Sequence, residues 1–194
     1  METRNSHGLE QFCVSLEERS GLSILDLAGI NQQTVSFVTN YGHRIYADDF
    51  VFQLDQCFGA DGDFYENQSN PLLVEQFLNT VLQFPDESYD GILVWDSLQY
   101  LAPSLLALVV ERLRRVARSG SSLLAIFHSE EKLAPVNTYA FRIHDSRTLI
   151  LAPRGARRPS QVFNNRTLEK VFQDFQSVKF FLTRGQLREL IIRR

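Results

Sequence analysis

A strand, a helix and a second strand follow one another within about 27 residues near the start of the sequence, and this succession restricts the fold more than any other feature. Residues 23–27 are apolar except for one acid and lead into Ala28 and Gly29, which is typical of a buried strand entering a turn. Residues 31–41 carry apolar side chains at helical spacing, and residues 43–47 predict the second strand. This is the size of one βαβ crossover, so we expect the two strands to be parallel.

The middle of the chain continues the alternation of helices and strands. Residues 70–82 begin with Asn and Pro, which favour the first positions of a helix, and carry an apolar stripe. Residues 91–95 and 122–127 are short apolar runs that predict buried strands. Between them, residues 104–118 form the clearest helical pattern of the sequence, which we expect to end before Gly120.

The last third of the chain has a different pattern. Residues 138–143 and 147–151 are strand-like and separated by a short polar turn, which predicts a hairpin. Residues 153–159 are rich in arginine and predict a loop, and a short helix is expected to begin at Asn164 or Asn165 and to run through Phe175. The chain then closes with two short apolar segments, residues 178–182 and 190–192, which predict an antiparallel pair.

The length of 194 residues and 44% apolar composition fit one globular domain over residues 1–194. Within it we expect a helical N-terminal extension (1–20) and a hairpin insertion (130–160) that could cover an acceptor. The N-terminus lacks a charged, apolar leader, and no apolar stretch is long enough to cross a membrane, so we expect a cytoplasmic protein without membrane insertion. Cys13 and Cys57 are far apart, which excludes a disulfide framework or a zinc cage, and we expect no metal site.

Charge is unevenly distributed along the chain. Residues 1–150 hold 10 basic and 20 acidic side chains, whereas residues 151–194 hold 10 basic and 3 acidic ones. The basic end is either a docking surface for an acidic partner or a solvated face whose arginines pair with the acidic remainder. No nucleic-acid motif accompanies it and the formal net charge is −3, so a nucleic-acid partner is not expected. The oligomeric state stays open.

Acidic side chains follow three of the predicted strands. Asp26 ends the first strand, Asp48 and Asp49 follow the second, and Asp96 follows the strand over residues 91–95. The carboxyl ends of parallel strands form the ligand-binding edge of such a sheet. Asp49 comes 23 positions after Asp26, a spacing at which a carboxylate can accept hydrogen bonds from a nucleoside ribose. The alternative is that each acid only caps the helix that follows it.

Four segments together resemble the ordered signature of class I S-adenosylmethionine-dependent methyltransferases. They are residues 24–29 (ILDLAG), 42–49 (GHRIYADD), 84–101 (FPDESYDGILVWDSLQYL) and 112–124 (RLRRVARSGSSLL). The resemblance covers roughly residues 20–194. It implies an α/β, Rossmann-like fold: a mostly parallel seven-stranded sheet, helices on both faces, and a final antiparallel hairpin from residues 178–192.

The resemblance also implies a cofactor, S-adenosylmethionine, held by the turn after the first strand and by the acids that follow the strands. The residues it assigns to the cofactor are Asp26, Ala28, Gly29, Asp48, Asp49 and Asp96. The candidates for catalysis by position are Asp96, Tyr100 and His128, each of which follows a strand near the expected cleft. Trp95 is expected in the core, with a stacking platform for an acceptor as the alternative.

The sequence departs from the family pattern at two places. The family turn is rich in glycine, which allows positive φ and close approach of a ligand, but only Gly29 is present here, followed by Ile30 and Gln32. The family's third strand has no clear counterpart between Phe50 and Phe84, where the sequence predicts only a loop over residues 61–70 and the helix over residues 70–82.

Two hypotheses for function follow. In the first, the protein transfers a methyl group from S-adenosylmethionine to an unidentified small-molecule acceptor. In the second, it is a catalytically inactive methyltransferase-like protein that acts as a binding or scaffold module through a protein partner. The three strand-end acids favour the first, and the altered turn favours the second. A nicotinamide-dependent oxidoreductase is a weaker alternative because the chain has no GxGxxG turn.

Overall fold

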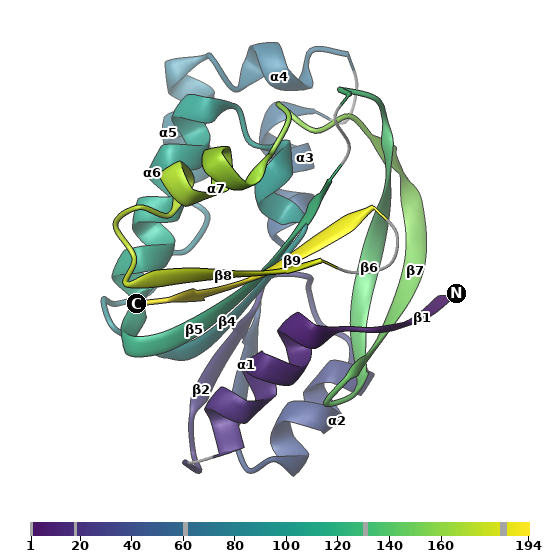
Figure 1. The fold of residues 1–194 in the computed structure, drawn as a ribbon. Coiled ribbons are helices and arrows are strands. Elements are labelled where there is room, and N and C mark those ends of the chain that lie inside the picture. Colours follow the sequence, from purple (N-terminus) through teal and green to yellow (C-terminus); the bar gives the residue numbers. More distant parts are fainter. Residues whose placement is uncertain (1, 18, 60–61, 130–131, 183–185) are drawn as a thin grey trace.

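The computed structural model describes residues 2–17, 19–59, 62–129, 132–182 and 186–194. Its centre is a six-stranded sheet with the order β3-β2-β4-β5-β9-β8 (Figure 1). The strands are β2 (Ser23–Asp26), β3 (Arg44–Ala47), β4 (Tyr89–Trp95), β5 (Ala117–His128), β8 (Ser177–Leu182) and β9 (Leu187–Arg193). The first four pair in parallel and the last two antiparallel, which confirms both expectations. Over the residues that the structure describes, this sheet has six strands, one fewer than the resemblance implied.

The missing strand is the one that the family would place after β3. Here β3 is followed by three helices, α3 (Phe50–Phe58), α4 (Phe64–Asn67) and α5 (Pro71–Leu78). Phe50, Leu54 and Phe58 are buried one turn apart, so this segment buries its apolar side chains as a helix. The region predicted as a loop contains α4, and β3 remains an edge strand of the sheet.

The helix predicted from Asn70 begins there as expected. The side chain of Asn70 accepts a hydrogen bond from the backbone N–H of Leu72, and Pro71 takes the first helical position. The helix ends at Leu78 and not at Leu82, and the side chain of Arg112 donates to the carbonyl oxygens of Leu78 and Val81 that follow this end.

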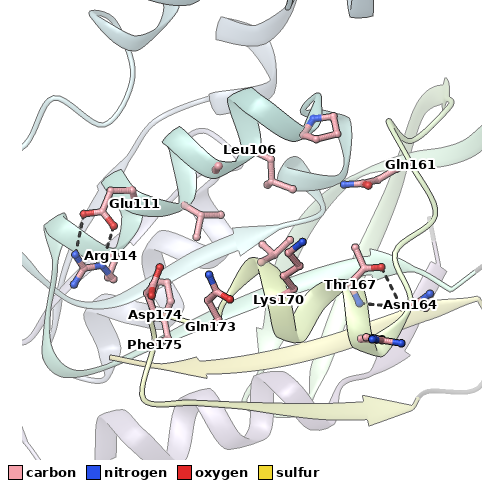
Figure 2. Close-up of a pocket in the computed structure, with 15 residues that line it drawn as sticks. Leu106, Glu111, Arg114, Gln161, Asn164, Thr167, Lys170, Gln173, Asp174 and Phe175 are labelled. Carbon is pink, nitrogen blue, oxygen red and sulfur yellow. Dashed lines mark hydrogen bonds and ion pairs between the residues drawn. The ribbon is translucent and has the colours of Figure 1, made fainter.

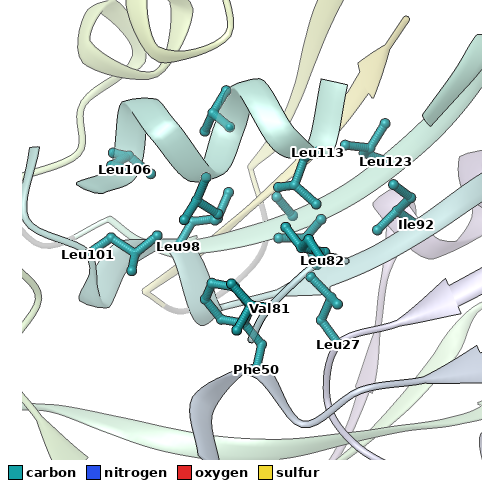
Figure 3. Close-up of a cluster of buried hydrophobic side chains, with 14 of the residues drawn as sticks. Leu27, Phe50, Val81, Leu82, Ile92, Leu98, Leu101, Leu106, Leu113 and Leu123 are labelled. Carbon is teal, nitrogen blue, oxygen red and sulfur yellow. The ribbon is translucent and has the colours of Figure 1, made fainter. Parts of the chain in front are cut away.

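Helices α6 (Pro103–Val116) and α7 (Asn165–Val171) pack on the same face of the sheet as α3–α5 (Figure 1). The apolar face of α6 is buried as predicted, and Figure 3 shows Leu113 from this helix beside Leu123 and Ile92 of the sheet. Helix α6 ends earlier than predicted, and Gly120 lies within β5, because Ala117 leaves the helical conformation and pairs with Tyr89.

Helix α7 is capped at its start by Asn164, whose side chain accepts from the backbone N–H of Thr167. It ends at Val171 and not at Phe175. The remaining segment up to Phe175 turns back toward the sheet, and Phe172 and Phe175 are buried in the same core.

The opposite face of the sheet is covered by α1 (His7–Glu17), α2 (Gln32–Asn40) and a second sheet. This smaller sheet has the order β1-β7-β6 and is formed by β1 (Glu2–Asn5), β6 (Val136–Asp145) and β7 (Thr148–Arg157). Helix α1 is tied to the main sheet by the buried carboxylate of Glu189 on β9, which accepts from the backbone N–H of Gly8 at 2.7 Å. A second hydrophobic cluster fills this side.

The predicted hairpin is present as β6 and β7, but it is longer than the sequence indicated. Pro153 and Gly155, in the segment predicted as a loop, pair with Tyr139 and Thr138 of β6. The register shifts between Thr138 and Tyr139, a β-bulge that accommodates a proline without a ladder hydrogen bond. The role of this insertion as an acceptor cover stays a prediction.

Some predicted segments fall partly outside the described residues. These are residues 1 and 18 of the N-terminal extension, residue 61 of the predicted loop, residues 130 and 131 of the insertion, and residues 183–185 of the predicted final hairpin. Among the helices of the described residues, none has the length and apolar character needed to cross a membrane.

Candidate functional site at the carboxyl ends of the parallel strands

The carboxylate of Asp26 lies at the end of β2 and is 1% exposed. Its Oδ1 accepts two hydrogen bonds, from Trp95 Nε1 at 2.7 Å and from the backbone N–H of Ala28 at 3.0 Å. Burial raises the pKa of Asp26 to about 6, while these two hydrogen bonds act in the opposite direction. The carboxylate is therefore engaged within the protein.

Trp95 is buried at the end of β4, which confirms its expected place in the core. Its backbone has a φ of 58°, an uncommon conformation for a large residue. The indole stacks on the ring of Phe141 from β6, with centroids 5.2 Å apart and planes 4° from parallel. Trp95 thus joins the ends of β2 and β4 to the hairpin that covers them.

The turn after β2 is closed by hydrogen bonds to the connection between β3 and α3. The backbone N–H of Gly29 donates to the carbonyl of Asp48 at 3.1 Å, and that of Phe50 donates to the carbonyl of Leu27 at 3.1 Å. Ala28 and Asp49 form an isolated antiparallel bridge. The backbone N–H groups of Ala28 and Gly29 therefore already donate to protein atoms.

Asp49 is the N-cap of α3, and its Oδ1 accepts from the backbone N–H of Phe52 at 3.1 Å. The same oxygen lies 3.9 Å from Nη1 of Arg154 on β7, whose Nη2 is 3.4 Å from the carbonyl oxygen of Ala28. Gly29 has a φ of 81°, and a Cβ placed there would lie 3.0 Å from Asp49 Oδ2. Asp48 is half-buried, and this burial raises its pKa. Asp49 therefore caps a helix, which is the alternative role that the sequence allowed for it.

A chain of hydrogen bonds joins the three catalytic candidates. Tyr100, in the 3₁₀ helix η1 (Ser97–Tyr100), donates its hydroxyl to Asp96 Oδ2 at 3.1 Å and accepts from Gln99 Nε2 at 3.0 Å. Gln99 Oε1 faces His128 at the end of β5: the backbone N–H donates to it at 3.0 Å, and Nδ1 lies at 3.1 Å. Sequence reasoning missed Gln99 as a member of this series of hydrogen bonds, because nothing in the local sequence marks its amide as a functional group.

Burial shifts the titration of the groups at both ends of this chain. It raises the pKa of Asp96 to about 7, and it lowers the pKa of His128 to about 4. Burial also raises the pKa of the Tyr100 hydroxyl. His128 is consequently neutral at pH 7.

A cavity of about 450 Å³ lies at the strand ends. It is lined by Asp49, Val51, Phe52, Asp55, Asp96, Tyr100, Thr138, Tyr139, Arg154, Gly155, Ala156 and Arg157. Arg157 pairs with Asp55 at 2.5 Å and lies over the rings of Phe64 and Tyr100 at 4.5 and 5.5 Å. In the described part of the chain, no group of three or more His, Cys, Asp or Glu side chains is arranged to hold a metal ion.

Searches of the sequence against protein-family models and against curated proteins give no match. The fold, in contrast, matches many solved structures. A protein from Pyrococcus horikoshii has a TM-score of 0.54 at 14% identity, with 96% of this chain and 87% of that chain covered. A S-adenosylmethionine-dependent methyltransferase from Methanosarcina mazei has a TM-score of 0.53 at 13% identity, with 93% of this chain and 95% of that chain covered.

The chain has a class I methyltransferase-like fold. This confirms the resemblance stated from the sequence motifs. Identities of this size establish the fold and not the chemistry, because function depends on the site that a fold carries.

The residues present do not fit the cofactor that the methyltransferase-like fold implies. The resemblance assigns the turn after β2 to the methionine and ribose portion of S-adenosylmethionine, but the N–H groups of Ala28 and Gly29 already donate to Asp26 and to the carbonyl of Asp48. Asp49, assigned to the ribose hydroxyls, is held by α3 and faces Arg154. A ligand that bound these N–H groups and this carboxylate would have to displace the contacts that they make within the protein.

The structure brings the predicted residues together in two groups. Asp26, Ala28, Gly29, Asp48 and Asp49 are in mutual contact around the β2 turn, and Asp96, Tyr100 and His128 form the chain through Gln99. Asp49 and Asp96 line the same cavity, so the acids after β3 and β4 do converge. Sequence reasoning missed two contacts of Trp95: its hydrogen bond to Asp26 and its stacking on Phe141. Both join elements that are far apart in the chain.

Proposed function

We infer that this protein is a catalytically inactive methyltransferase-like binding module, which works without S-adenosylmethionine and acts through a protein partner. The observation that carries this proposal is the hydrogen bond from Trp95 to Asp26, with Phe141 stacked on the indole. It places protein side chains against the turn that would otherwise receive the cofactor.

Two further features support the proposal. Arg154 of β7 reaches both the carbonyl of Ala28 and the carboxylate of Asp49, so the hairpin supplies polar partners to the turn and to the acid after β3. The strand-end acids then have a structural reason to be present in a protein without a cofactor: Asp26 accepts from Trp95, Asp49 caps a helix, and Asp96 holds Tyr100.

Calorimetric titration of the purified protein with S-adenosylmethionine, and then with S-adenosylhomocysteine, tests this function. We expect no heat of binding and no thermal shift at millimolar ligand, for the protein and for an Asp49→Ala variant alike. Micromolar binding that is lost in Asp49→Ala would establish a cofactor site and overturn the proposal.

Methyl transfer to a small-molecule acceptor is the second candidate, and one observation favours it. The cavity at the strand ends has about 450 Å³, within the size range of ligand pockets, and its lining includes Asp96 and Tyr100. Binding of the cofactor in the titration above would select this candidate, and the search for an acceptor would then begin with compounds that fit the cavity.

A further inference from the structure

A long groove runs between α6 and the segment that includes α7 and leads into β8 (Figure 2). It has a volume of about 640 Å³ and shares no lining residue with the cavity at the strand ends. Its apolar floor is formed by side chains of the main core cluster, namely Leu106, Val110, Val171 and Phe175. The exposed residues Pro103 and Ala107 of α6 extend the apolar surface to one edge of the groove.

The rim of the groove is charged, and the charge differs between its two ends. At one end Arg114 pairs with Glu111 at 2.8 Å, and Asp174 lies close by, as Figure 2 shows. Arg166 and Lys170 are exposed on α7 and lie one helical turn apart, on the same side of the helix. Within the described part of the chain the side chains of these two residues form no hydrogen bond and no ion pair.

This combination specifies the chemistry of an occupant. An apolar floor beside a helix of 14 residues, roughly 21 Å long, accepts the apolar face of another helix of three to four turns. The two cations on α7 select carboxylates spaced one turn apart on that helix.

We propose that the groove between α6 and α7 binds an amphipathic helix of a partner protein, with apolar side chains on the floor and two acidic residues against Arg166 and Lys170. This inference rests on the proposed function, because it assigns the surface through which the module would act. The groove lies on the helical face of the main sheet, and none of its lining residues belongs to the turn after β2.

The test uses two synthetic helical peptides, labelled with fluorescein and followed by fluorescence anisotropy. Both carry leucines on one face; one carries a glutamate pair spaced i, i+4 beside that face, and the other carries lysines at the same two positions. We expect the glutamate peptide to bind the protein and the lysine peptide to bind about tenfold more weakly.

Charge reversal in the protein localises the binding. Arg166→Glu combined with Lys170→Glu should lower the affinity for the glutamate peptide about tenfold and raise the affinity for the lysine peptide. The matched control is Arg19→Glu with Lys132→Glu, two exposed cations outside the groove, which changes the net charge equally and should leave the preference for the glutamate peptide in place. Ala107→Gln, which blocks the groove without changing its charge, should lower the affinity for both peptides. Thermal melts followed by circular dichroism confirm that each variant is folded.

Two results would overturn the proposal: no anisotropy change for the glutamate peptide at millimolar protein, or equal effects of the groove variant and its control. These outcomes are separate from the cofactor titration. If S-adenosylmethionine binds while the peptides behave as expected, the proposed docking site is supported and only the proposal of a cofactor-free function is rejected.

Discussion

Trp95 donates its indole N–H to the buried carboxylate of Asp26, so the last residue of β4 is bonded to the last residue of the neighbouring parallel strand β2. In a sheet of this type the ends of these two strands are where a ligand would enter. The bond, together with the stacking of Phe141 on Trp95, makes the site part of the folded core.

The first prediction concerns this bond. Trp95→Phe removes the donor and leaves Asp26 with only the backbone N–H of Ala28, so we expect a loss of about 1–3 kcal/mol in the free energy of unfolding. Urea unfolding at pH 8, where the carboxyl is ionised, measures it. In an Asp26→Asn background the same substitution should cost less, because the bond to a neutral oxygen is weaker. An equal cost in both backgrounds would mean that only packing of the indole matters.

The second prediction concerns the contact between Gly29 and Asp49. Gly29→Ala places a Cβ 3.0 Å from Asp49 Oδ2 in a residue with a φ of 81°, whereas Gly42→Ala has a φ of 79° and open space around the added atom. We expect Gly42→Ala to cost about 1–2 kcal/mol for the backbone alone, and Gly29→Ala to cost on the order of 1 kcal/mol more. Chemical denaturation compares them, and the extra cost should shrink in an Asp49→Ala background, which removes the carboxylate but keeps the Cβ at 3.2 Å. If the extra cost is unchanged there, the contact with the Asp49 carboxylate is not its cause.

The third prediction is a pH dependence that arises from Asp96. Burial raises its pKa from 3.8 to about 7 in the folded protein, so between these values the native state holds a proton that the unfolded state has released. The free energy of unfolding contributed by this group therefore falls as pH rises from about 4 to 7. Asp96→Asn lacks this dependence, while other titrating groups are common to both proteins.

We therefore expect the stability difference between the protein and Asp96→Asn to move in favour of the variant as pH rises across this window. Thermal and urea unfolding at pH 4.5, 6 and 7.5 measure the difference. A difference that is constant with pH would show that Asp96 titrates alike in the folded and unfolded states.

The main strands and their parallel pairing could be predicted from local pattern. Short apolar runs such as Gly91–Trp95 and the acids that end them mark buried strands, and a helix between two such runs fixes parallel pairing. The sequence also showed no strand between Phe50 and Phe84, but the helix that residues 50–58 form there was not predicted.

The closing contacts of the site could not be predicted in this way. Arg154 reaches Ala28 across 126 positions of sequence, and the local pattern of Pro153 to Arg157 gives no sign that β6 holds these residues as a strand. Likewise the hydrogen bond between Trp95 and Asp26 depends on strand register and on a positive φ, neither of which a run of apolar residues encodes. Sequence reasoning thus located the acidic residues at the strand ends but missed the side chains that contact them.

The last prediction concerns the tautomer of His128. Gln99 donates its amide Nε2 to the hydroxyl of Tyr100, so its Oε1 is an acceptor and the facing Nδ1 of His128 must carry the hydrogen. Burial lowers the pKa of His128 to about 4, so this neutral form should persist when pH falls from 7 to about 5. Long-range ¹H–¹⁵N correlation spectra of the ¹⁵N-labelled protein report which ring nitrogen is protonated. In Gln99→Leu the acceptor is gone and the preference for Nδ1–H should weaken; an Nε2–H form in the unsubstituted protein would contradict the hydrogen-bond chain from Asp96 to His128.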